Sequence, residues 1–98
     1  MKENLAKIHA IAEELFLSKT EVKLQSNNTR LLLSLTSQYK SVPPTTPLWL
    51  LRDFCNKTND LLPYPYVNWE AGAIGIKANN KVLEISFPLD NFKSISNE

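Results

Sequence analysis

The residues that most often carry chemistry in proteins are sparse in this chain. It holds one histidine, His9, and one cysteine, Cys55, far apart in the sequence and without a neighbouring motif that would activate either. Its only glycines are Gly72 and Gly75, so no glycine-rich loop can cradle a phosphate. We therefore expect no catalytic residues, and the sequence indicates no specific activity.

Metal ligands are equally scarce, because no spacing of the CxxC or HExxH type occurs. The neighbouring carboxylates Glu13 and Glu14 are typical of the solvated face of a helix. His9 is expected to pack its ring at the flank of an apolar stripe, and Cys55 to be a small buried hydrophobe. The chain is therefore expected to bind no metal and no cofactor and not to be an enzyme.

Composition is that of an ordinary globular protein, with 98 residues, a net charge of +1 and 43% hydrophobic residues. We expect one domain over residues 1–98, with a frayed tail from about residue 90. The near-neutral charge argues against nucleic-acid binding by electrostatics alone. Residues 1–15 lack the apolar run of a signal peptide and no segment is long enough to span a membrane, so the expected location is the cytoplasm.

Aromatic side chains on polar faces are the strongest sign of a binding surface. On a helix over residues 47–60, Trp49 shares a stripe with Arg52 and other polar residues, away from the apolar stripe. Trp49 either packs onto the loop at residues 43–44 or is exposed as a contact residue. Tyr64 and Tyr66 flank two prolines and extend the same patch. Trp, Tyr and Arg are favoured at interface hot spots, so these four residues are the predicted partner-binding set.

Two helices are predicted from apolar residues at helical spacing. The first covers residues 3–17, with a stripe of Leu5, Ile8, Ile11, Ala12, Leu15 and Phe16. The second begins at Pro47 with Thr46 as its cap, because proline loses nothing in a first turn where the N–H is unpaired. Its predicted buried residues are Leu51, Phe54, Cys55, Thr58, Leu61 and Leu62.

The segment from residue 18 to 40 fits two structures. As a hairpin turning at Asn27-Asn28, it would pair Leu24 with Leu31 and Val22 with Leu33. As a helix, residues 29–40 would present Leu31, Leu32, Leu35 and Tyr39 at helical spacing. The hairpin is favoured, because Val22 and Leu24 have no place on a helix.

Residues 66–87 predict a three-stranded antiparallel meander. With a turn at Asn79-Asn80, Ile76 faces Leu83 and Ile74 faces Ile85. A second turn at residues 71–72 sets Trp69 opposite Ile74 and Val67 opposite Ile76, with Trp69 on the core face. The fold class is therefore α+β, with helices packed on one face of an antiparallel sheet.

The C-terminal half resembles a group of small uncharacterised bacterial proteins. In that group a Pro-x-Pro-x-Val-like entry and a glycine turn are followed by two short strands that end in Leu-Glu-Ile. The matching residues here are Pro63-Tyr64-Pro65-Tyr66-Val67, Ala71-Gly72-Ala73-Ile74-Gly75-Ile76 and Val82-Leu83-Glu84-Ile85. In that group a proline-bearing loop and a helix precede the strands. The resemblance implies a helix followed by a β-meander, and it brings no catalytic residues because the group has no established activity.

The sequence is compatible with two functions. The first is a protein-interaction module, an accessory subunit of antitoxin-like or immunity-like type, that binds a protein partner or a second copy through the aromatic patch or a sheet edge. The alternative is a winged-helix-like DNA-binding domain, which requires residues 29–40 to be a helix. Its recognition helix would be residues 46–59, presenting Arg52, Asn56 and Lys57 to the groove.

Overall fold

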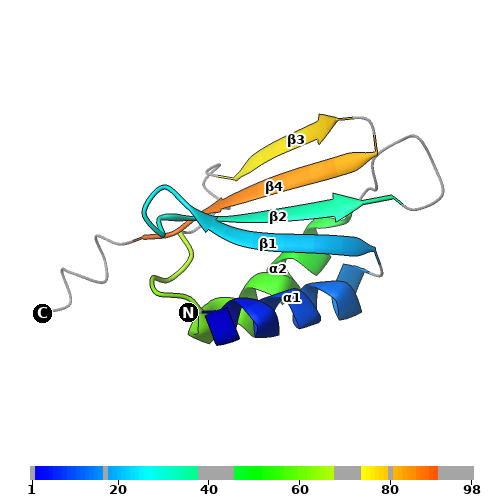
Figure 1. Cartoon of the computed structure of the whole chain (residues 1–98). Helices are drawn as coiled ribbons and strands as arrows, with labels where there is room; N and C mark the ends of the chain where they lie inside the picture. Colours follow the sequence, from blue (N-terminus) through cyan, green and yellow to red (C-terminus); the bar gives the residue numbers. More distant parts are fainter. Residues whose placement is uncertain (1, 17, 38–45, 68–73, 80, 91–98) are drawn as a thin grey trace, which may run out of the picture.

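The computed structural model describes residues 2–16, 18–37, 46–67, 74–79 and 81–90. Two helices lie on one face of an antiparallel sheet, which is an α+β arrangement of two layers (Figure 1). The strand order in the sheet is β1-β2-β4-β3. In chain order the elements are α1 (Lys2–Phe16), β1 (Lys19–Gln25), β2 (Arg30–Thr36), α2 (Leu48–Thr58), a 3₁₀ turn η1 (Asn59–Leu61), β3 (Gly75–Asn79) and β4 (Val82–Pro88).

The hairpin predicted for the first half of the chain is confirmed. β1 and β2 pair antiparallel, with Val22 opposite Leu33 and Leu24 opposite Leu31. Ser26, Asn27 and Asn28 in the turn all adopt positive φ, a conformation that asparagine tolerates better than most residues. The helical alternative for residues 29–40 is wrong over the described part, because residues 30–36 form β2. The three-helix order needed by a winged helix is therefore not met.

The predicted meander is corrected in its strand order and its register. Asn79 pairs with Val82, and Ile76 lies opposite Ile85 where Leu83 was expected, a shift of two residues. Because side chains alternate with a period of two, this shift leaves every side chain on its predicted face. The β4 strand, expected at an edge, pairs with both β2 and β3, and β3 is the edge strand.

The segment expected to start the meander pairs with β4 instead of β3. The Val67 N–H donates to the Pro88 carbonyl at 3.0 Å, and Tyr66 forms an isolated bridge with Leu89. Val67 is therefore not opposite Ile76. The predictions for Trp69, for the turn at residues 71–72, for the loop at residues 43–44 and for the tail at residues 91–98 lie outside the described residues.

Both predicted helices are confirmed, but the cap of α2 is not. Pro47 occupies the cap position, with an extended backbone and no side-chain hydrogen bond to the helix. Its carbonyl accepts from the Leu50 N–H at 3.1 Å. Thr46 lies one residue before the cap position, and its buried Oγ1 has no hydrogen-bond partner among the described residues. No helix in the described part of the chain is long and apolar enough to cross a membrane.

The core lies between the helices and the sheet, and it centres on Phe54. Its ring packs against Phe16 at a centroid distance of 5.7 Å and against Phe87 at 5.8 Å. The predicted stripes of both helices contribute to this core. Its fully or nearly fully buried members are Ile8, Ala12, Leu31, Leu33, Leu35, Leu51, Phe54, Cys55, Leu83, Ile85 and Phe87.

Candidate protein-binding surface

The first turn of α2 exposes two large apolar side chains. Leu48 is 63% exposed and Trp49 is 65% exposed. Leu48 stands three residues before the buried Leu51, so helical spacing would place it on the inward side. Its exposure shows that the core ends before this turn, and the start of α2 projects beyond it. Trp49 is therefore exposed; any contact with residues 43–44 lies outside the described residues.

Arg52 lies one turn after Trp49 and is exposed on the same helix. A residue three positions along a helix is a surface neighbour, so the predicted pair of Trp49 and Arg52 is brought together. Tyr64 is half-buried and follows η1, beyond the opposite end of α2. An eleven-residue helix is roughly 16 Å long, so Trp49 and Tyr64 do not form one continuous patch.

Tyr66 faces the core. Its hydroxyl hydrogen-bonds to Thr58 Oγ1 at 2.7 Å, and its ring meets Phe87 edge-on at a centroid distance of 5.6 Å. Thr58 Oγ1 also donates to the Phe54 carbonyl at 2.8 Å, so in the bond with Tyr66 the phenol is the donor. Burial raises the pKa of the Tyr66 phenol far above its ordinary value, because the charged phenolate would lose its hydration there. These contacts tie Tyr66 to the fold.

A third large apolar side chain is exposed on β3. Ile76 is 61% exposed, whereas Ile85, directly opposite on β4, is fully buried. Directly opposite residues share a face, so Ile76 belongs to the face that the helices cover. The helix layer therefore ends at β4 and leaves the helix-side face of β3 open. All five residues of β3 are exposed.

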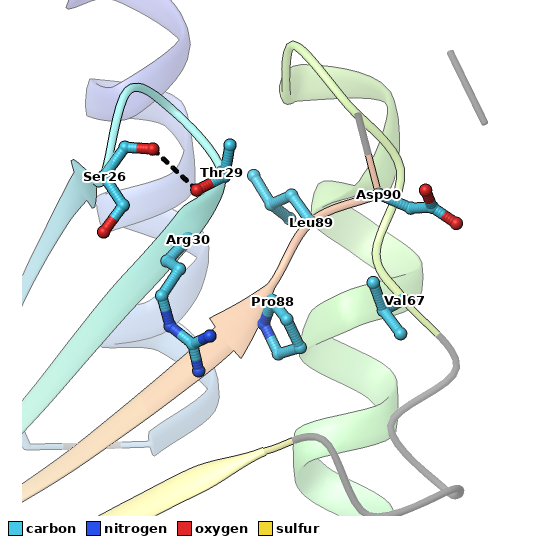
Figure 2. Close-up of a pocket in the computed structure, with 7 residues that line it drawn as sticks. All are labelled: Ser26, Thr29, Arg30, Val67, Pro88, Leu89 and Asp90. Atoms are coloured by element: carbon cyan, nitrogen blue, oxygen red, sulfur yellow. Dashed lines mark hydrogen bonds between the residues drawn. The ribbon is translucent and has the colours of Figure 1, made fainter. Parts of the chain in front are cut away.

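A shallow hollow of about 690 Å³ opens where the β1–β2 turn meets the end of β4 (Figure 2). It is lined by Ser26, Thr29, Arg30, Val67, Pro88, Leu89 and Asp90. Thr29 Oγ1 donates to the Ser26 carbonyl at 2.6 Å, and Arg30 Nε donates to Ser86 Oγ at 2.7 Å. These polar groups are already engaged in the fold.

The His9 ring and the Cys55 thiol, the groups most able to carry chemistry, have structural roles. His9 Nε2 donates to the Thr20 carbonyl at 2.8 Å, and Nδ1 lies 3.7 Å from Glu13 Oε1. Cys55 is a buried thiol in the core and is not part of a disulfide, as predicted. Within the described ranges, no three His, Cys, Asp or Glu residues gather closely enough to hold a metal ion.

No family model matches the chain, and neither a curated protein nor a solved structure is significantly similar to it. The resemblance to small bacterial proteins therefore stays a prediction.

The sequence pointed to Trp49 and Arg52 but missed Leu48 and Ile76. Leu48 and Ile76 both fit the periodicity of a core face. Periodicity does not indicate where the elements that cover this face end. One signal was available for Leu48, since it opens the Leu48-Trp49-Leu50-Leu51 run, too wide for a single buried stripe. For Ile76 the strand order was needed.

Proposed function

We propose that this protein is a non-enzymatic interaction module that binds another protein through the first turn of α2. The observation that carries the proposal is the adjacent pair Leu48 and Trp49, both more than 60% exposed, whereas the leucine, isoleucine and phenylalanine side chains of α1 all pack in or against the core. We name Leu48, Trp49 and Arg52 the α2 patch.

The α2 patch has the composition of an interface centre. Tryptophan and arginine are enriched among residues whose truncation costs the most binding energy. Exposed apolar side chains that lie together, rather than scattered singly, mark interaction sites on soluble proteins. An accessory subunit of antitoxin-like or immunity-like type would use such a surface to hold its target.

The test is quantitative capture of partners from native lysate by the tagged chain, read by mass spectrometry with and without nuclease. Wild type and Lys7→Ala, an exposed control on α1, are expected to capture the same protein. Trp49→Ala is expected to lose it by about tenfold or more, the loss typical of a hot-spot residue. Its melting temperature should stay near that of wild type, because the side chain is mostly exposed.

Equal capture by all three proteins would overturn the proposal. Capture of nucleic acid, with every protein lost after nuclease, would overturn it in favour of a DNA- or RNA-binding role. A large fall in the melting temperature of Trp49→Ala would instead assign the indole to packing.

A further inference from the structure

The open edge of β3 carries backbone groups that the sheet does not use. The Ser37 N–H donates to the Lys81 carbonyl at 2.9 Å, and the Leu89 N–H donates to the Thr29 carbonyl at 2.7 Å. The backbone N–H and C=O groups of odd-numbered residues in β4 therefore point toward β2 and hydrogen-bond to it. Because bonding directions alternate along a strand, the even-numbered residues of β4 bond toward β3.

The register carries this alternation onto β3. Gly75, Lys77 and Asn79 lie opposite the even-numbered Ser86, Glu84 and Val82. These three residues of β3 therefore bond to β4, and the N–H and C=O of Ile76 and Ala78 point toward the open side. In the described part of the chain, no strand pairs with that side.

The opposite edge of the sheet is better protected. On β1 the corresponding outward groups belong to Thr20, Val22 and Leu24, and the Thr20 carbonyl already accepts the hydrogen bond from His9. Alternating charges at Lys19, Glu21 and Lys23 also line that strand. Charged side chains and covering elements are the usual means of blocking an edge, and β3 has only Lys77.

The chemistry of β3 specifies its partner strand. On the helix side, Ile76 presents apolar surface with Ala78 beside it. On the outer face, Lys77 lies between Glu84 on β4 and the vacant position beyond the edge. Lys81 follows in the turn, and residues 75–81 contain no acidic side chain. An added strand complements this edge when it places apolar residues opposite Ile76 and Ala78 and a carboxylate opposite Lys77.

A second copy of β3 does not have that chemistry. Its outer-face residues are Gly75, Lys77 and Asn79, so every pairing that keeps the apolar residues on one side leaves Lys77 without an acidic neighbour. Pairing centred on Lys77 would set two lysines directly opposite each other, which is destabilising. The charge therefore favours a segment from a different protein.

We infer that β3 is the docking edge for an extended apolar–acidic–apolar segment of the partner protein, bound by strand addition. This inference rests on the proposed function and adds the partner's local structure and chemistry. The three-residue pattern reads the same in either direction, so it applies to parallel and antiparallel addition alike.

The probe is a random heptapeptide library displayed on phage and selected on the full chain, followed by synthesis of the enriched peptide. Enriched peptides are expected to carry Asp or Glu between two aliphatic residues. On titration, amide exchange measured by NMR should slow at least tenfold at Ile76 and Ala78. The Lys77 amide, already bonded to β4, should change little.

Two variants distinguish the contribution of backbone hydrogen bonds to peptide binding from the contribution of the Lys77 charge. Ala78→Pro removes an outward N–H without breaking a bond to β4, a position where edge strands accept proline, and should weaken the peptide about tenfold or more. Lys77→Ala should remove the preference for an acid in a repeated selection. Circular dichroism melting of both variants confirms that they fold.

Enrichment of peptides without an acid, or binding that leaves the exchange of Ile76 and Ala78 unchanged, would overturn the inference. Slowed exchange of these amides in the free protein as its concentration rises would overturn it in favour of a second copy. In the lysate capture, loss by Trp49→Ala but full retention by Ala78→Pro would leave the proposed function standing and refute strand addition.

Discussion

Single residues in this protein divide into those that build the fold and those that the fold leaves open. Tyr66 and Trp49 show the division most clearly. Both were expected in one aromatic patch. The Tyr66 hydroxyl, however, hydrogen-bonds to Thr58, whereas Trp49 is 65% exposed. An aromatic side chain beside a proline gives no sign of which way it faces, because the direction depends on contacts far away in the sequence.

The buried phenol of Tyr66 makes stability depend on pH in alkaline solution. The folded chain keeps this proton to a higher pH than the unfolded chain, whose tyrosines titrate near pH 10. The stabilisation is thus complete below about pH 10. Above it, the free energy of unfolding should fall by up to about 1.4 kcal/mol per pH unit from this group.

Urea titrations of Tyr66→Phe at several pH values test this. At neutral pH the variant should be less stable by about 0.5–1.5 kcal/mol, since it lacks the hydrogen bond to Thr58. Above pH 10 the gap to wild type should close, while Tyr64→Phe should follow wild type throughout. A gap that stays constant up to pH 11 would contradict the assignment.

At the scale of elements, α2 has a buried part and a projecting part. Leu51 is 1% exposed and Leu48, one turn earlier, is 63% exposed. In chemical denaturation, Leu51→Ala should cost about 2–5 kcal/mol, as large-to-small changes in cores do. Leu48→Ala should cost less than about 0.5 kcal/mol, as surface changes do. Similar losses for the two variants would show that the first turn is packed.

Much of the element structure could be predicted because local chemistry and long-range packing agree. Alternation of Val22 and Leu24 with polar neighbours, and turn residues that accept positive φ, were sufficient for the β1–β2 register. The same reasoning missed the β3–β4 register by two residues. Alternation determines which face a side chain occupies, but shifts by two satisfy it equally well, so it could not select the observed pairing of Asn79 with Val82.

The order of the strands in the sheet could not be predicted from the sequence for a related reason. Residues 75–79 and 82–88 both alternate, so either could stand at the edge. The central position went to β4, which carries Leu83, Ile85 and Phe87 and so buries more apolar surface between β2 and β3. With β3 at the edge, Ile76 became exposed, and the candidate site gained a residue that pattern alone assigns to the core.

At the scale of the whole molecule, one helix layer covers β1, β2 and β4 and ends before β3 (Figure 1). The uncovered features are the first turn of α2 and the outer strand. They account for Leu48, Trp49 and Ile76, the large hydrophobic side chains that are exposed among the described residues. Each of these features remains available after the core is complete, which is what a module that binds another protein requires.

Binding through the first turn of α2 can be tested directly by site-specific photo-crosslinking in the native host. p-Benzoylphenylalanine is placed at position 49, or at position 7 on the exposed side of α1 as a control. If the first turn of α2 is a binding surface, position 49 gives one discrete protein adduct and position 7 gives none, as identified by mass spectrometry. An absence of adducts at position 49, or the same adducts from both positions, would contradict the claim that the start of α2 is a binding surface.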